Sequence, residues 1–313
     1  MTRSLAPAAA LLFLSITTAC GSTSKPPGEG AGPGDAASSD TGPGDGGDAS
    51  PSESGDDGGS TCTLTANTTP TGTVTNGCAL VTRDTSACNA SRSAAGLSGF
   101  WLKFSCRVTV TATSSDVTLA SDGRPDHESN YFPATDPCYA PYSPVDLDPN
   151  HIEVHALSLT VPLAPTSASQ AMSLGAVGMA VDGSAIFDNQ AAPGDDLYEE
   201  ASSFDRCGGH PSPAEQYHYH TEPYAISYDD DAFIGVLRDG YPLYGRHDAD
   251  GSTPANLDAS GGHTGTTPDS PSTAVYHYHV NLQTSHASTS AGQTEWFLTT
   301  GTYAGPPGTC TGC

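Results

Sequence analysis

Two short stretches, Arg107-Val-Thr-Val-Thr-Ala-Thr113 and Val117-Thr-Leu-Ala120, alternate apolar with polar residues. A period of two places the apolar side chains on one face, which is typical of strands that are buried on one side. The run from His151 to Val161 continues the alternation, and clusters of Pro, Gly, Asn and Asp separate the runs. Because no long segment has the 3.6-residue period of a capped helix, the sequence predicts an all-β or β-dominated, sandwich-like fold with long Gly-, Pro- and Asp-rich loops.

The composition is strongly acidic. The 313 residues include 35 acidic and 10 basic side chains, which give a formal net charge of -25. A nucleic-acid-binding surface needs Lys and Arg to neutralise phosphates, so the composition excludes nucleic acid as a partner. Hydrophobic residues make up only 36% of the chain, beside 35 Gly and 25 Pro. We therefore expect part of the chain not to pack into a core.

Residues 1–20 are organised like an export signal. Arg3 precedes an apolar segment, and small residues lead up to Cys20. The pattern resembles a bacterial lipoprotein signal, in which the cysteine becomes the lipidated first residue of the mature chain; cleavage near Ala19 as an ordinary signal is the alternative. We expect an exported outer-membrane or cell-surface lipoprotein, held to the membrane only through the lipid on Cys20, or otherwise a periplasmic or secreted protein.

Residues 21–60 are expected to form a disordered acidic tether. This segment has twelve Gly, eight acidic residues and one Lys, but no Val, Ile, Leu, Met or aromatic residue. It cannot bury enough apolar surface to offset the entropy of ordering. A Gly-rich coil of this length has an end-to-end distance of about 35 Å, which would hold a folded domain away from a membrane.

Eight cysteines follow the tether, and an even number in an exported chain predicts four disulfides without indicating the pairs. They are Cys62, Cys78, Cys88, Cys106, Cys138, Cys207, Cys310 and Cys313. The last two form a C-x-x-C pair, which we interpret as a structural link because no second C-x-x-C accompanies it as a zinc site would require. We expect residues 61–110 to form a cysteine-containing N-terminal part and residues 111–313 to form the main domain.

The main domain contains an internal repeat, at about residues 176–223 and 233–282. Each copy has an Asp-Gly strand segment, then Asp-x-x-Gly-Gly-His, then Tyr-His-Tyr-His. In the first copy these begin at Gly178, Asp205 and Tyr217, and in the second at Gly235, Asp258 and Tyr276. The motifs keep their internal spacing while the connections between them differ in length, which separates fixed structural pieces from variable loops.

From about Val110 to the C-terminus the chain resembles the YHYH family of exported proteins, named for the tetrapeptide. An upstream element, Ser121-Asp-Gly-Arg-Pro-Asp-His127-Glu, is similar to the family's Gly, Pro, Asp and His segment. The resemblance implies a YHYH domain and implies no particular reaction.

The histidines of the repeat are the candidate metal ligands. On a strand, residues i and i+2 point to the same face, so the two histidines of each Tyr-His-Tyr-His motif can bind one ion. The histidine of each Gly-Gly-His turn can supply a third ligand. The predicted ligands are His210, His218 and His220, then His263, His277 and His279, with His127 as a seventh candidate.

Acidic and aromatic neighbours are expected to orient these ligands. The Asp of each Asp-x-x-Gly-Gly-His motif can hold an imidazole or cap the turn, and the tyrosines occupy the opposite strand face. These outer residues are Asp205, Asp258, Tyr217, Tyr219, Tyr276 and Tyr278. The segment Asp248-Ala-Asp250-Gly251 lacks the closing Glu of a calcium loop, so we interpret it as a β-turn.

Imidazole ligands favour Zn or Cu, and three Met residues are too few for a thioether copper site. The sequence thus predicts a surface-tethered metal-binding protein, either a metal-dependent enzyme or a non-catalytic metal carrier. The alternative is a structural or adhesive β-rich module without metal. Because a ligand histidine must be neutral, its reference pKa of about 6.5 predicts that bound metal is lost near pH 6 to 7.

Overall fold

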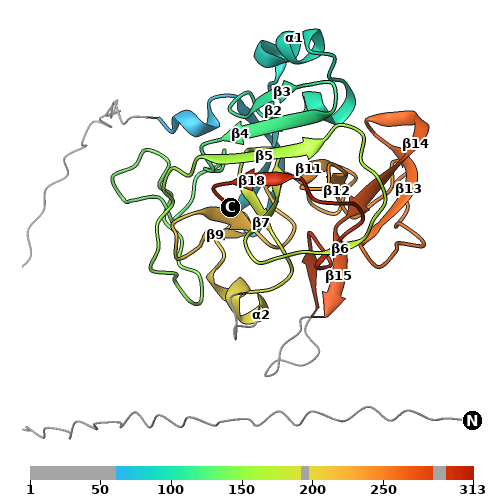
Figure 1. Ribbon diagram of the computed structural model, residues 1–313. Coiled ribbons are helices and arrows are strands. Elements are labelled where there is room, and N and C mark those ends of the chain that lie inside the picture. Colours follow the sequence, from blue (N-terminus) through green and yellow to red (C-terminus); the bar gives the residue numbers. More distant parts are fainter. Residues whose placement is uncertain (1–60, 192–196, 285–293) are drawn as a thin grey trace, which may run out of the picture. The chain divides into compact units, whose positions relative to one another are not determined.

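The computed structural model describes residues 61–191, 197–284 and 294–313 (Figure 1). The predicted signal, the tether and the predicted lipidation site at Cys20 lie outside the described residues. Among the described helices, none is both long and apolar enough to span a membrane.

The described residues form 18 strands and five short helices, so the prediction of a β-dominated fold is confirmed. The strands are β1 (Thr68–Thr75), β2 (Cys78–Arg83), β3 (Thr109–Ala112), β4 (Asp116–Ser121), β5 (Leu157–Pro162), β6 (Gln170–Ala171), β7 (Ala176–Ala180), β8 (Ala185–Phe187), β9 (Gly209–Pro211), β10 (Tyr217–Tyr219), β11 (Phe233–Leu237), β12 (Pro242–Tyr244), β13 (Gly262–Thr267), β14 (Ser270–His279), β15 (Asn281–Thr284), β16 (Thr294–Phe297), β17 (Thr302–Tyr303) and β18 (Thr309–Thr311). The helices are the α-helices α1 (Ser86–Ala94) and α2 (Leu197–Glu200) and the 3-10 helices η1 (Thr63–Thr65), η2 (Gly99–Leu102) and η3 (Ala201–Ser203).

The alternating stretches form an antiparallel sheet of four strands in the order β18-β5-β4-β3. Along β5 buried residues alternate with half-buried ones, as the period of two predicts. The predicted extension of this strand back to His151 is wrong, because β5 begins at Leu157. The amides of Ile152 and His155 donate to the loop carbonyls of Tyr131 and Asp122 instead of to a neighbouring strand.

The repeat forms a second sheet of eight strands in the order β13-β14-β12-β11-β7-β8-β10-β9. Outward from its centre, each half has the same arrangement: β7-β8-β10-β9 from the first copy and β11-β12-β14-β13 from the second. In both halves the Tyr-His-Tyr-His strand runs parallel to the short strand that follows the Asp-Gly turn. The three remaining sheets are two-stranded pairs, β1-β2, β15-β16 and β6-β17.

Strands β7 and β11 join the two halves. They pair antiparallel with Met179 opposite Val236, which hold equivalent places in the two copies, so the sheet is arranged about an approximate two-fold axis. The equivalent glycines Gly178 and Gly235 flank this pair. A Cβ atom on Gly178 would lie 2.7 Å from the carbonyl oxygen of Val236, and one on Gly235 would lie 2.8 Å from Cα of Ala180. The close approach of the two strands therefore requires glycine at both positions.

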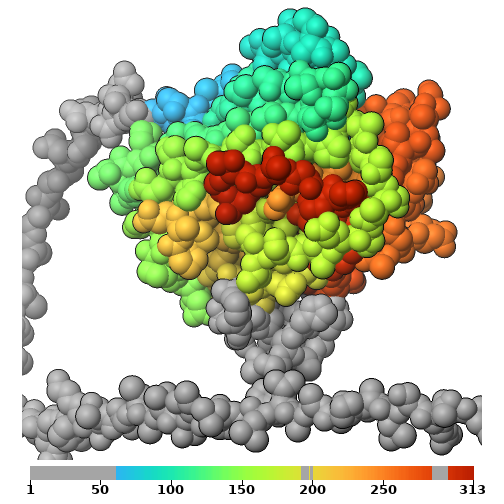
Figure 2. All heavy atoms as spheres, viewed as in Figure 1, coloured from blue at the N-terminus to red at the C-terminus, as the bar shows by residue number. Residues whose placement is uncertain are grey.

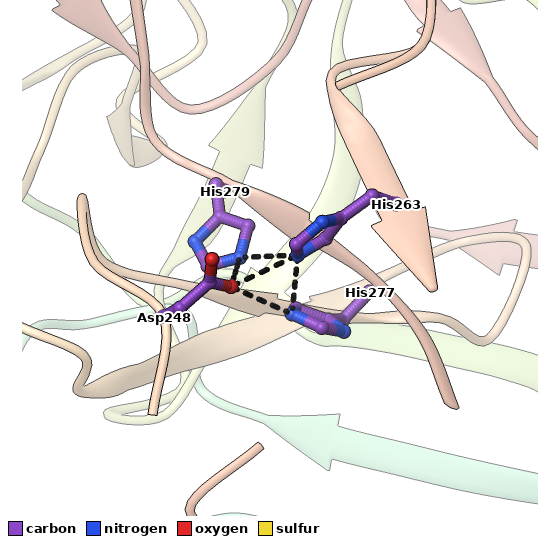
Figure 3. Close-up of side chains that lie close together, drawn as sticks. All are labelled: Asp248, His263, His277 and His279. Carbon is purple, nitrogen blue, oxygen red and sulfur yellow. Dashed lines mark hydrogen bonds and ion pairs between the residues drawn. The ribbon is translucent and has the colours of Figure 1, made fainter. Parts of the chain in front are cut away.

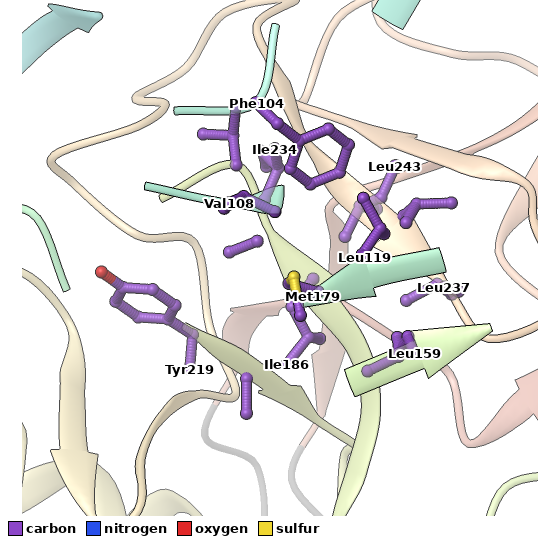
Figure 4. Packing of buried hydrophobic residues seen from close by; sticks show 14 of the residues in the cluster. Phe104, Val108, Leu119, Leu159, Met179, Ile186, Tyr219, Ile234, Leu237 and Leu243 are labelled. Carbon is purple, nitrogen blue, oxygen red and sulfur yellow. The ribbon is translucent and has the colours of Figure 1, made fainter. Parts of the chain in front are cut away.

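The four- and eight-stranded sheets share one hydrophobic core, as the sandwich-like prediction requires (Figure 4). Leu119 and Leu159 from the smaller sheet belong to the same buried cluster as Met179, Ile186 and Leu243 from the larger one. The C-terminal strand β18 adds to β5 at the edge of the smaller sheet, and Figure 2 shows this red segment at the surface.

Four disulfides form, as the cysteine count predicts: Cys62–Cys138, Cys78–Cys207, Cys88–Cys106 and Cys310–Cys313. Two of them connect residues 61–110 to the main domain. Cys207 lies within the first Asp-x-x-Gly-Gly-His turn, so its bond to Cys78 fastens the turn that precedes His210.

Candidate metal centres

Three histidines of the first copy meet at one point, which we call site 1. His210 on β9 pairs directly with His218 on β10, and His220 follows two residues later on the same face. The Nε2 atom of His218 lies 3.1 Å from that of His210 and 3.0 Å from that of His220. All three side chains are buried.

The equivalent histidines of the second copy, together with Asp248, form site 2 (Figure 3). His263 on β13 pairs with His277 on β14, and their Nε2 atoms are 3.2 Å apart. The Nε2 atom of His279 lies 3.3 Å from that of His263. Asp248 directs Oδ1 into the group, at 3.0 Å from Nε2 of His263, 3.3 Å from that of His279 and 3.9 Å from that of His277.

The first histidine of each Tyr-His-Tyr-His motif is oriented by its own strand. Nδ1 of His218 lies 3.1 Å from the carbonyl oxygen of Gln216, and Nδ1 of His277 lies 3.0 Å from that of Val275. A carbonyl oxygen only accepts hydrogen bonds, so Nδ1 carries the ring hydrogen in both residues. Nε2 is then the atom with the lone pair.

The second histidine of each motif is oriented by the neighbouring strand. Nδ1 of His220 donates to the carbonyl of Asp188 at 2.6 Å, and Nδ1 of His279 donates to that of Gly245 at 2.8 Å. Asp188 and Gly245 occupy equivalent positions in the two copies, immediately after β8 and β12. Both copies therefore hold their histidines in the same tautomer by the same backbone contacts.

A connecting segment orients the remaining histidine of site 1. The hydroxyl of Ser203 donates to the carbonyl of Glu200 at 2.7 Å, so its oxygen accepts the hydrogen from Nδ1 of His210 at 2.8 Å. The carboxylate of Glu200 also faces the histidines, with Oε1 at 3.5 Å from Nε2 of His210 and Oε2 at 3.8 Å from Nε2 of His220. Site 1 thus also has an acidic group beside its imidazoles.

This arrangement directs nitrogen lone pairs toward one another, because the oriented imidazoles carry their hydrogens on Nδ1. Such an arrangement of neutral rings is repulsive unless a cation lies between them. Tetrahedral ligands about 2.1 Å from an ion are about 3.4 Å apart, and the measured Nε2 separations of 3.0 to 3.3 Å are close to that value. Both triads have a geometry suited to one transition-metal ion.

Burial keeps five of these imidazoles neutral, those of His210, His218, His220, His277 and His279. Burial and, to a lesser extent, the neighbouring His220 together lower the pKa of His210 to about 3. Burial also lowers the pKa of His220 to about 4 and that of His277 to about 4. The pKa values of His218 and His279 shift in the same direction for the same reason. The uncharged form is the one that binds metal.

The tyrosines of the first motif occupy the opposite face of β10 and are fully buried. Tyr217 donates to Asp205 at 3.0 Å, and Tyr219 donates to Asp182 at 2.9 Å. Asp205 also accepts the amides of Cys207 and Gly209, so its carboxylate caps the turn and holds a tyrosine. Of the two roles expected for this Asp, the contacts support the turn cap.

The second motif repeats these contacts. Tyr276 donates to Asp258, and Tyr278 donates to Asp239, the equivalent of Asp182. The hydroxyl of Tyr278 also accepts the amide of Ala304 at 2.7 Å. The Asp of each Asp-Gly turn therefore anchors the strand that carries the histidines, a role that the sequence did not indicate.

Replacing Tyr278 with Phe is expected to destabilise the protein by about 1 to 3 kcal/mol, because the buried amide of Ala304 and carboxylate of Asp239 each lose a hydrogen-bond partner. Urea unfolding of the metal-free protein measures this change. Tyr139→Phe is the control, since Tyr139 is 37% exposed and should tolerate the loss of its hydroxyl. Equal unfolding midpoints for the two variants would contradict this role.

His127, the seventh candidate ligand, lies on the tyrosine face. Its Nε2 atom is 3.0 Å from the hydroxyl of Tyr219 and 3.3 Å from that of Tyr217, and Nδ1 contacts the carbonyl of Glu128. The structure therefore brings His127 to the tyrosines and to neither histidine triad.

Sequence reasoning missed Glu200 and Asp248, whose carboxylates face the Nε2 atoms of the two triads. They come from equivalent connections, between β8 and β9 in the first copy and between β12 and β13 in the second. The β-turn predicted at Asp248 does form, since the amide of Gly251 donates to the carbonyl of Asp248. The side chain of Asp248, however, faces site 2. No sequence signal marked Glu200, because the two connections differ in length and in sequence.

A cavity of about 320 Å³ opens onto site 1. All three histidines and Glu200 line it, together with Phe187, whose ring stacks on His218 at a centroid separation of 3.8 Å. Site 1 can therefore be reached by a small molecule although its histidines are buried.

Residues 158–256 match the family model described as YHYH protein. The matched segment contains the histidines of site 1 and Asp248, and it ends before His263. No curated protein and no solved structure matches the chain. Residues 158–256 are therefore similar to the YHYH family, which supports the resemblance seen in the sequence.

Proposed function

We propose that this protein binds two transition-metal ions, one at each histidine triad. The observation that carries the proposal is the convergence of the Nε2 atoms in both triads while backbone carbonyls or Ser203 hold the Nδ1 hydrogens of five rings. Histidines that only packed or formed hydrogen bonds would not need Nε2 lone pairs that face one another. This arrangement occurs at equivalent positions in both copies. The geometry favours metal binding over a purely structural or adhesive role.

The ligand types favour Zn²⁺ or Cu²⁺. Three imidazoles with one carboxylate suit either ion, and site 2 has this ligand set within 4.8 Å. The acidity of the chain supports the same conclusion, because residues 61–313 carry a formal charge of -19, a field that attracts cations. Export and lipid anchoring through Cys20 would place this binding at a cell surface or in the periplasm.

Elemental analysis of protein purified without a polyhistidine tag tests the proposal. After mild supplementation with Zn²⁺ or Cu²⁺ and removal of excess ion, about two transition-metal ions per chain are expected. Less than about one ion per two chains would contradict the proposal and would favour the structural alternative.

Metal retention is expected to persist to lower pH than the reference pKa of histidine predicts. The buried histidines His210, His220 and His277 have pKa values of about 3 to 4, so they remain neutral at about pH 5 and protons do not compete with metal there. Metal content measured after dialysis should be equal at about pH 7 and pH 5 and should fall near pH 4. Half-loss near pH 6.5 would show that the imidazoles titrate as exposed groups.

A further inference from the structure

The two sites differ in how their acidic group is placed. In site 2, Oδ1 of Asp248 and the three Nε2 atoms all lie within 4.8 Å of one another. In site 1, the ligand atoms that all lie within 4.8 Å of one another come from the three histidines. Glu200 faces them with one oxygen 3.5 Å from His210 and the other 3.8 Å from His220. One oxygen of Asp248 thus joins the three imidazoles of site 2. In site 1, the two oxygens of Glu200 each face a different imidazole, and the shorter of the two separations is longer than that of Asp248 from His263.

The cavity at site 1 lies where a further ligand would approach the metal. Its volume of about 320 Å³ corresponds to about ten water molecules at about 30 Å³ each, which is enough for a small organic molecule. Its walls include the apolar side chains of Leu174, Phe187, Ala191, Pro211 and Pro213. A molecule with a compact apolar part fits these surroundings.

The charges that line the cavity favour an uncharged molecule. Glu200 and Asp148 both line it, and Oδ2 of Asp148 lies 3.7 Å from Nδ1 of His210. Two carboxylates balance the charge of one divalent ion, so an additional anion gains little and is repelled by both acids. A neutral nitrogen or oxygen donor avoids this repulsion and can still coordinate the metal.

We propose that site 1 is the reactive site, where the metal coordinates a small neutral nitrogen or oxygen donor from the cavity, while Asp248 closes site 2 into a structural site. The inference rests on the proposed function, since it requires metal at both triads. It assigns different roles to two halves whose histidines are arranged alike, as open and closed coordination spheres separate reactive from structural metal sites.

Cobalt spectroscopy on single-site variants of the full chain tests this assignment, because the visible bands of Co²⁺ report its ligands. His277→Ala retains site 1 and His218→Ala retains site 2. Imidazole at about pH 8.5, where it is largely uncharged, is the neutral probe, and azide is the anionic one. Imidazole should shift the cobalt bands of His277→Ala and leave those of His218→Ala unchanged. Azide should bind site 1 at least tenfold more weakly than imidazole.

Two further variants keep the test decisive if a histidine substitution impairs folding. Leu174 is 51% exposed at the cavity, so Leu174→Trp should fold, retain two cobalt ions and weaken the imidazole response at least tenfold. Asp248→Ala should open site 2 and add a second imidazole response. Equal responses of the two single-site variants, no response in His277→Ala loaded with cobalt, or no effect of Leu174→Trp would overturn the assignment. Failure of the wild-type chain to bind cobalt would instead overturn metal binding itself.

Discussion

Replacing His218 with alanine is expected to reduce the metal content from about two ions per chain to one. The Nε2 atom of His218 lies within 3.1 Å of both other imidazoles of site 1, so its loss removes the central ligand of that triad. Loss of one of three histidine ligands should weaken binding by about 100-fold or more, since even residues that only orient ligands contribute about 10- to 100-fold. Site 2 should be unaffected.

The equivalent substitution in the second copy makes the experiment symmetrical. His277→Ala should also leave about one ion per chain, and the double variant should bind none. His151→Ala is the control, because His151 is exposed and belongs to neither site. Elemental analysis after removal of excess metal gives the counts. Two ions in the double variant would show that the metal binds elsewhere.

Replacing Gly235 with alanine is expected to destabilise the protein by more than about 3 kcal/mol. Its Cβ atom would overlap the carbonyl oxygen of Met179 and lie 2.8 Å from Cα of Ala180. Both belong to β7, which is buried along its whole length, so the backbone has no room to move aside. The effect should be seen in urea unfolding of the metal-free, disulfide-intact protein.

Gly265→Ala provides a matched control on another strand of the same sheet. A Cβ atom there would lie 3.4 Å from its nearest neighbour, Cε1 of His277, which is ordinary van der Waals contact. Its unfolding free energy should stay within about 1 kcal/mol of the wild-type value. If Gly235→Ala also lowered the free energy of unfolding by less than about 1 kcal/mol, β7 and β11 would not pack as closely as described.

The features that could be predicted from the sequence depend on strand periodicity. Tyr-His-Tyr-His on a strand places its histidines on one face and its tyrosines on the other, and both copies follow this rule. The turn histidines also reach the motif, because Gly-Gly-His begins a strand that pairs with it, as His210 does with His218. These relations are local, or they connect segments separated by a short hairpin.

Contacts across longer stretches of chain could not be predicted in this way. Asp182 meets Tyr219 only because β8 and β10 pair in parallel after a long connection, and a period of two does not specify which strands pair. The same limit applies to Glu200 and Asp248 in their variable loops, and to the choice of cysteine partners. His127 was predicted as a metal ligand because the sequence does not reveal that it contacts the tyrosines rather than the histidines.

X-ray diffraction at the absorption edge of the bound metal tests the central claim most directly. In crystals of the Zn²⁺- or Cu²⁺-loaded protein, two anomalous peaks per chain are expected. One should lie about 2.0 to 2.2 Å from Nε2 of His210, His218 and His220, and the other equally close to Nε2 of His263, His277 and His279. Loaded crystals whose peaks lie elsewhere, with both triads free of metal, would contradict the account.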